Sequence, residues 1–219
     1  MIYSTRRTTL VLIIVGLSLM GCANMSAKTD YSAFEQYYPR SILVIPPLNN
    51  SVEANAPYIY LSTITRPLAE AGYYVYPVSV VDAFLKDNGL PTPGEMNAVP
   101  LEKIRENIGA DAVLYVTIEE WGQKFELISS KSIVSAKARL VDVQTGTILW
   151  TGSAHLSDSS GNSSGGGLLG DIVAAVIDQV AGSVVDRTHG LSSQANHIMI
   201  LNPRTGLLPG PYKLTAKDS

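Results

Sequence analysis

The sequence predicts an α/β fold: a single, three-layer-like domain with a mixed sheet. Between residues 41 and 121, short apolar runs typical of strands alternate with helix-like segments, an order typical of parallel βα units. Between residues 121 and 156, strand-like runs follow one another with only short turns, which is typical of an antiparallel meander. An amphipathic segment then predicts a C-terminal helix that packs on the sheet.

Residues 1–21 have the pattern of an export signal that is removed. Arg6 and Arg7 precede a largely apolar run over residues 10–20, which has about half of the roughly 20 residues that a membrane-spanning helix needs. The only cysteine of the chain, Cys22, follows directly. We consider a buried thiol, a catalytic nucleophile and a lipid attachment site for it. Activation of a thiol needs a neighbouring base or cation, and the next four residues supply neither.

The three residues before the cysteine, Leu19, Met20 and Gly21, resemble the lipobox of bacterial lipoproteins. The resemblance implies that signal peptidase recognises these residues, that the bond before Cys22 is cut, and that the cysteine sulfur carries a diacylglycerol. Several acyl chains, such as palmitate, anchor a protein firmly, whereas one chain binds reversibly. The next residue, Ala23, is not the aspartate that retains lipoproteins in the inner membrane. The resemblance therefore implies the outer membrane, with the domain facing the periplasm.

The exported chain has 198 residues, with 14 basic and 19 acidic side chains and a formal charge of −5. This length corresponds to about one domain. A protein that binds nucleic acid usually carries a basic patch, so we expect no nucleic-acid partner. Residues 22–40 are polar with scattered tyrosines, and we expect them to form a lipidated tether.

The first expected elements support the parallel part of the sheet. Residues 41–47 (SILVIPP) predict a buried strand that two prolines end. Pro57 marks the start of a helix that runs to Gly72, a residue suited to a left-handed cap, although Pro67 should kink or break this helix. The following segments predict a strand at 73–79, a helix at 80–86, a loop at 88–96, a helix at 100–108 and a central strand at 110–121.

The later elements are expected to complete the sheet and cover it. Apolar and polar residues alternate over residues 131–143, the period of a strand with one wet face. The remaining segments predict a strand at 147–156, a flexible Gly/Ser loop at 157–167, a helix at 171–187, a short strand at 197–203 (HIMILNP) and a tail at 202–219. We therefore expect the folded domain to span residues 41–201. The Gly/Ser loop lacks the lysine that a phosphate-binding P-loop requires.

The residues that could carry chemistry do not form a recognised pattern. The histidines are His155, His189 and His197. They are not joined by acidic residues at metal-binding spacing, so we expect no metal and no cofactor. His155 could form a triad with Asp158 and a nearby serine, but no Gly-x-Ser-x-Gly elbow is present, and an ordinary strand-end histidine is the alternative. Glu119 and Glu120 are adjacent on a strand and should point to opposite faces. We expect no enzyme.

Tyrosine is unusually frequent, with eleven tyrosines against three phenylalanines. Exposed tyrosines favour protein interfaces because they offer contact area and a polar tip. We therefore select Tyr58, Tyr60, Tyr73 and Tyr74 as a candidate interface. The alternative is that these side chains cap the sheet from its rim.

Three segments resemble known envelope proteins: ILVIPPLNNS, IGADAVLYVTI and ARLVDVQTGTILWTGSA. They are similar to the α/β domains of the curli-secretion-channel lipoprotein and of the lipoprotein activators of penicillin-binding proteins. The whole exported chain resembles a bacterial lipoprotein family of unknown function, domain of unknown function 799. The resemblance implies a non-enzymatic binding or assembly subunit that works with other envelope lipoproteins, with a homo-oligomer as one arrangement. It supplies no catalytic residues.

Two alternative functions remain open. An activator of a peptidoglycan synthase would have to reach the inner membrane, and the 18 residues at 23–40 extend only about 60 Å. A small envelope hydrolase would need a formed pocket around His155. Residues 122–135 lack the alternating apolar band of a membrane-spanning hairpin, so we expect no pore.

Overall fold

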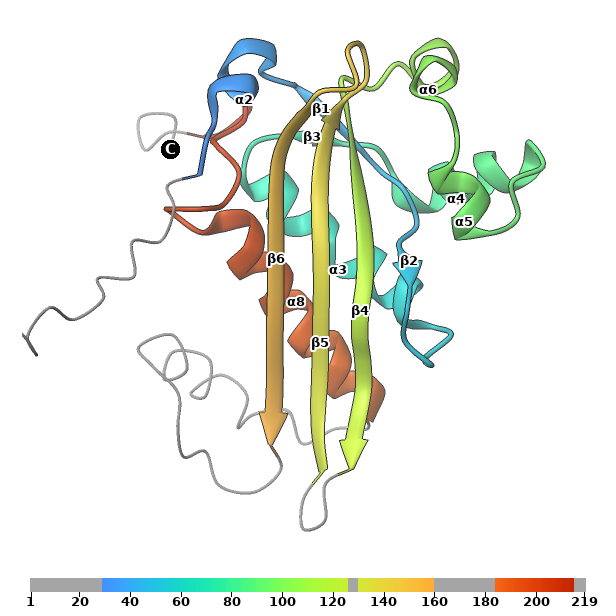
Figure 1. Cartoon of the computed structure of the whole chain (residues 1–219), viewed down its shortest axis with the longest axis vertical. Coiled ribbons are helices and arrows are strands. Elements are labelled where there is room, and N and C mark those ends of the chain that lie inside the picture. Colours follow the sequence, from blue (N-terminus) through green and yellow to red (C-terminus); the bar gives the residue numbers. More distant parts are fainter. Residues whose placement is uncertain (1–28, 126–129, 160–183, 215–219) are drawn as a thin grey trace, which may run out of the picture.

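The computed structural model describes residues 29–125, 130–159 and 184–214, and a six-stranded mixed sheet forms their centre (Figure 1). The strands are β1 (Ser41–Val44), β2 (Leu48–Asn49), β3 (Tyr74–Val75), β4 (Ala112–Phe125), β5 (Ser130–Asp142) and β6 (Ile148–Ser159). The helices are α2 (Ser32–Tyr37), α3 (Ala56–Glu70), α4 (Val78–Asp87), α5 (Pro93–Asn97), α6 (Leu101–Asn107) and α8 (Val184–Leu201). The predicted fold class is confirmed. The export signal and Cys22 lie outside the described residues.

The sheet has the order β3-β1-β4-β5-β6, and β2 also pairs with β4. The first strands are parallel: β1 pairs with β3 and β4, and β2 pairs with β4 further along. The three long strands β4, β5 and β6 are antiparallel neighbours. As expected, β4 is central, and the parallel βα part precedes the meander.

The two faces of the sheet are covered differently. Strand β4 sends Leu114 into the core beneath α3 and α8 and Val113 into a second core beneath α4, α5 and α6, because neighbouring residues of a strand point to opposite faces. Figure 1 shows α3 and α8 behind the three long strands. The second core involves only the first part of β4, where three layers form. Further along the meander, the same face exposes Lys137 and His155.

The first helix of the parallel part is continuous, so the prediction that Pro67 breaks it is wrong. Proline removes one backbone donor, but Pro67 lies three residues before the end of α3, at Glu70. Pro67 and Leu68 are both buried in the core. Their burial holds the last turn in place, and Gly72 follows with a φ of 97°.

The loop expected at residues 88–96 contains the first part of α5. Thr92 accepts a hydrogen bond from the backbone of Glu95, and Glu95 accepts one from the backbone of Thr92. This capping box, with Pro93 in the first turn, satisfies donors that a helix start would otherwise leave free. The sequence contains the threonine and glutamate of this capping box at the required spacing, but the neighbouring prolines and glycines favoured a loop.

The short strand expected at residues 197–203 is wrong because most of these residues continue a helix. Residues 197–201 form the end of α8, which spans Val184–Leu201, and a turn follows. Met199 and Ile200 are buried against the sheet while His197 is exposed. Most of the helix expected at 171–187 lies outside the described residues. No described helix is long and apolar enough to cross a membrane.

The two ends of the described chain pack together. In α2, Phe34 is fully buried. The hydroxyls of Tyr31 and Tyr38 donate to the carbonyl oxygens of Gly206 and Pro209, at 2.5 and 2.6 Å. The expected tether at residues 22–40 is therefore wrong for its last part, because α2 forms there and Phe34 anchors it in the core.

Candidate functional site

The four candidate interface tyrosines do not form one patch. Tyr58 and Tyr74 are about half exposed, whereas Tyr60 and Tyr73 are buried. Side chains two residues apart in sequence lie about 200° apart around a helix, so Tyr58 and Tyr60 cannot share a face of α3. The hydroxyl of Tyr73 donates to the carbonyl oxygen of Leu208 at 2.5 Å. Burial raises the pKa of Tyr60 and of Tyr73, and these two residues belong to the core.

The histidines do not assemble a catalytic or metal-binding group. His155 lies opposite Ser135 on β5, and Asp158 lies opposite Ser132. These positions are on different faces of the sheet, so the triad considered for His155 does not form. On α8, His197 Nδ1 lies 3.7 Å from Glu70 Oε2. Within the described part of the chain, no three His, Cys, Asp or Glu residues are placed to hold a metal ion.

A β-bulge overturns the expectation that Glu119 and Glu120 point to opposite faces. Ile118 pairs with Ala136, but Glu120 pairs with Ser135, so Glu119 is an extra residue in β4. A bulge shifts the alternation of side chains. Glu119 and Glu120 therefore both reach lysines on the face of the sheet that exposes Lys137, with distances of 3.6 Å from Glu119 to Lys137 and 2.5 Å from Glu120 to Lys124.

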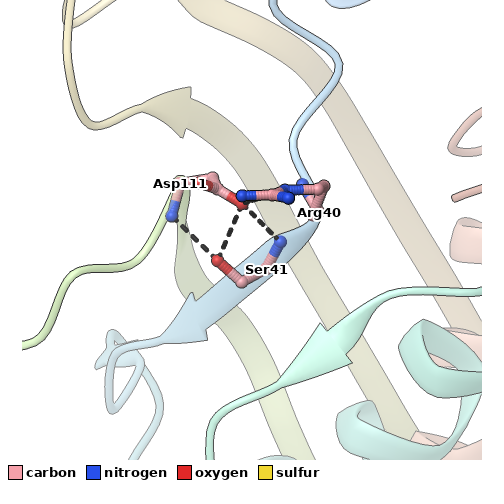
Figure 2. Close-up of polar contacts among 3 residues, drawn as sticks. All are labelled: Arg40, Ser41 and Asp111. Carbon is pink, nitrogen blue, oxygen red and sulfur yellow. Dashed lines mark hydrogen bonds and ion pairs between the residues drawn. The ribbon is translucent and has the colours of Figure 1, made fainter. Parts of the chain in front are cut away.

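The first hollow of the molecule lies at the amino ends of β1 and β4. These strands are parallel neighbours, so Ser41 and Asp111 meet (Figure 2). Asp111 Oδ2 accepts hydrogen bonds from the backbone N–H of Arg40 and Ser41, at 3.0 and 2.9 Å, and from the Ser41 hydroxyl, at 3.0 Å. The backbone N–H of Asp111 donates in return to Ser41 Oγ at 3.0 Å.

This amino-end hollow, of about 440 Å³, is a polar corner. Arg40, Arg105 and Gln144 line it together with Asp111 and Asp142. Asp142 accepts hydrogen bonds from the backbone and hydroxyl of Thr145, each at 2.7 Å, and so closes the β5–β6 turn. Both carboxylates therefore accept hydrogen bonds from the chain itself. Asp111 links the starts of β1 and β4, and this link is called the staple.

The second hollow lies beside β4 near the carboxyl end of the parallel strands. In open α/β sheets, ligands bind outside the carboxyl ends of the strands. This hollow, of about 410 Å³, is named the Trp121 groove. Its lining residues are Glu53, Asn55, Tyr58, Ile59, Ser62, Trp121, Gly122 and Thr188. They come from the loop after β2, the first turns of α3, the bulged part of β4 and the start of α8.

Trp121 is the unusual residue of this groove. Its side chain is 5% exposed, and its buried indole Nε1 has no hydrogen-bond partner in the part of the chain that the structure describes. A buried tryptophan N–H usually finds an acceptor. The other tryptophan, Trp150, follows this rule, because its Nε1 donates to the carbonyl oxygen of Thr205 at 2.8 Å.

A buried polar seam lies between α3 and α8. Thr63 Oγ1 lies 2.7 Å from Ser192 Oγ and accepts a hydrogen bond from Asn196 Nδ2 at 2.9 Å. Thr63, Ser192 and Asn196 are all buried. The sequence analysis selected neither this seam nor Trp121. The two irregular positions around Trp121 carry no sequence signal except the glycine at 122.

Comparisons with known proteins agree with this architecture. The family model "Putative lipoprotein GNA1162-like" matches residues 29–212. "Putative lipoprotein NMB1124/NMB1162" of Neisseria meningitidis serogroup B (strain ATCC BAA-335 / MC58) is 43% identical over 198 residues, or 89% of this chain and 91% of that one. The crystal structure of lipoprotein GNA1162 from Neisseria meningitidis is 47% identical, with a TM-score of 0.55 over 66% of this chain and 100% of that one.

A more distant likeness concerns the fold alone. The PelC dodecamer from Paraburkholderia phytofirmans is 15% identical, with a TM-score of 0.47, over 78% of this chain and 90% of that chain. At this level of identity the likeness says nothing about partners or assembly.

Proposed function

The chain belongs to the GNA1162-like lipoprotein family, and from this premise we propose that it is a non-enzymatic binding or assembly subunit of an envelope lipoprotein complex. A lipoprotein is anchored to a membrane of the cell envelope. In the proposal, Cys22 carries the lipid, Leu19, Met20 and Gly21 direct its processing, and the domain faces the periplasm from the outer membrane.

The observation that supports this proposal best is the open side of the meander. Strand β6 is twelve residues long and, among the described residues, pairs only with β5. Soluble proteins usually protect such an edge with lysine or proline, and β6 contains neither. Helix α2 contacts β6, while Thr151, Ser153 and His155 are exposed. Such an edge supports pairing with another protein.

A cross-linking pull-down from the native envelope tests the proposal. Full-length lipidated protein is compared with Cys22→Ala and with an edge variant that carries Ser153→Lys and Ser157→Lys. The matched control is Ser193→Lys, which adds a lysine at an exposed position of α8. We expect the wild type and Ser193→Lys to recover envelope lipoproteins, and the anchor and edge variants to lose most of them.

Two outcomes would contradict the proposal. Recovery of a peptidoglycan synthase as the dominant partner would replace assembly with the activator function. Recovery of no envelope protein by the wild type would remove the assembly proposal altogether. Unchanged recovery by the edge variant would leave the subunit role standing and exclude β6 as its contact.

A further inference from the structure

The Trp121 groove combines an unpaired donor with an apolar floor. Trp121 is nine-tenths or more buried, and its Nε1 has no acceptor among the described residues. An unpaired buried donor is costly and calls for a physical reason. An acceptor supplied by a bound molecule is such a reason, since Trp121 is one of the residues that line the hollow.

The backbone of β4 is irregular on both sides of this side chain. The extra residue Glu119 shifts the alternation, so that Ile118 and Trp121 both point into the core beneath α3 and α8. Gly122 then has a φ of 105°, in the region that favours glycine. Bulges often re-aim side chains next to functional sites. Together the two irregularities present Trp121 to the groove.

The rim of the groove is polar and carries a negative charge. Ser62 lines it from α3, and Glu53 and Asn55 line it from the preceding loop. Glu53 forms no ion pair with any cation in the described residues; its carboxylate accepts only the backbone N–H of Asn55, at 3.2 Å. Beside Glu53, Val52 is fully exposed, and Tyr58 exposes half of its surface.

An apolar floor inside a polar rim is the pattern of a protein interface. An acyl chain would need apolar surroundings along its whole length, which this rim does not provide. A peptide offers a side chain for the floor, backbone carbonyl oxygens for the indole N–H, and a basic group for Glu53. The volume of about 410 Å³ is within the range of sites for small ligands and short segments.

We propose that the Trp121 groove is the docking site for a peptide segment of a partner protein, with a large apolar side chain seated beside the indole and a Lys or Arg facing Glu53. This inference rests on the proposed function, because it adds to the β6 edge a second place where an assembly partner binds. The free chain buries Nε1, so docking requires the indole or its neighbours to move slightly.

The two tryptophans of the chain make a direct test possible. In the ¹⁵N-labelled exported chain, the only two indole N–H signals come from Trp121 and Trp150, and Trp→Phe variants assign them. The probes are acetylated, amidated pentapeptides, Lys-Leu-Phe-Leu-Lys, Lys-Leu-Ile-Leu-Lys and Lys-Leu-Leu-Leu-Lys, added to about 1 mM. We expect the Trp121 signal to shift with saturation while the Trp150 signal, already bonded to Thr205, stays fixed.

Control peptides and variants separate specific docking from general adhesion. Replacing the flanking lysines of the peptide by glutamate should weaken binding at least tenfold, because Glu53 then repels it. Ser62→Arg, which places a cation on the rim, should do the same for the lysine peptides. Ser193→Arg, an exposed serine on α8 outside the groove, should bind as the wild type does.

Three results would overturn the inference: no shift of the Trp121 signal with any lysine peptide, equal movement of both indole signals, or a shift produced by decanoate but not by the peptides. The envelope pull-down with Ser62→Arg separates this inference from the proposed function. If the wild type recovers partners and Ser62→Arg recovers them equally, the groove is not the assembly contact and the subunit role stands. If the wild type recovers none, the subunit role fails whatever the peptides do.

Discussion

The two tryptophans of the chain occupy the same face of one sheet and differ in their hydrogen bonding. Trp150 and Trp121 are 2% and 5% exposed, and both belong to the core beneath α3 and α8. Trp150 donates to Thr205, whereas Trp121 Nε1 has no partner. The two indole rings are therefore similarly buried, but among the described residues only the Trp150 N–H has a hydrogen-bond acceptor. The amino-end half of the sheet is closed by the chain itself, and the carboxyl-end half keeps a donor for another molecule.

The closed half is held by contacts between distant parts of the sequence. The hydroxyl groups of Tyr31 and Tyr73 donate to backbone carbonyls of the segment after α8. Asp111 joins the starts of β1 and β4. Part of the tyrosine excess thus serves the packing of the chain ends.

The largest loss of stability is expected for a substitution at Gly152, which packs against the ring of Trp150. A Cβ on Gly152 would lie 2.3 Å from two ring carbons of Trp150 and 3.0 Å from Met199 Cγ. In Gly152→Ala the ring must move and weaken its bond to Thr205, so we expect a loss of about 3 kcal/mol in the free energy of unfolding. Urea denaturation measures it.

Gly190→Ala is the matched control for this substitution. Gly190 lies in α8, and a Cβ there would meet nothing within 4 Å. Alanine is the better helix former, so this variant should gain about 0.5 to 1 kcal/mol. Equal losses in the two variants would show that Trp150 is not tightly fixed.

The next effect concerns the staple at the amino-end corner. Asp111→Ala removes the acceptor for two backbone N–H groups and the Ser41 hydroxyl, and we expect a loss of about 2 kcal/mol. Asp111→Asn, which keeps one acceptor oxygen, should lose about half as much. Asp87→Ala, at an exposed position near the end of α4, should stay within about 0.5 kcal/mol of the wild type. An unchanged unfolding midpoint for Asp111→Ala would refute the staple.

The direct comparison of the tryptophans should give a smaller difference. Trp150→Phe removes a hydrogen bond, while Trp121→Phe removes a donor that has no partner. Both lose some packing. We expect Trp150→Phe to be the less stable variant by about 1 kcal/mol, measured by urea denaturation under identical conditions. The reverse order would mean that Trp121 contributes to the closed core in the same way as Trp150.

The alternation of apolar and polar residues, together with the prolines and glycines that end strands, predicted most of the sheet. The alternation over residues 131–143 placed Val134 and Leu140 inside and Lys137 outside, as the structure has them. Pro67 and the segment at 197–203 misled because tertiary packing overrode local preference. An apolar run such as HIMIL fits a buried helix as well as a strand.

The candidate site was much less visible in the sequence. The Trp121 groove depends on the bulge at Glu119, and a bulge is set by the register between β4 and β5 rather than by any residue type. The same bulge reversed the expected placement of Glu119 and Glu120. The hydrogen bond of Trp150 depends on where Thr205 returns to the sheet, which no local pattern encodes.

The smallest effect on stability is expected at Glu120, which pairs with Lys124 in the carboxyl-end half of the sheet, here called the open half. The hydrogen bond from Lys124, with the nearby positive charges of Lys124, His155 and Lys131, lowers the pKa of Glu120 below its ordinary value of 4.5. A carboxylate with a lowered folded-state pKa stabilises the fold above its unfolded-state pKa, and this contribution is lost as the pH falls through the folded-state pKa.

The wild type should therefore be slightly more stable than Glu120→Gln at about pH 7, and the two should converge at about pH 3. Added salt should shrink the difference because the side chains of Glu120 and Lys124 are both exposed to solvent. Urea midpoints across this pH range measure the effect. A difference as large as that of Asp111→Ala would mean that the open half is held by its surface charges. The expected small difference would instead show that the ion pair of Glu120 with Lys124 contributes little to the stability of the fold.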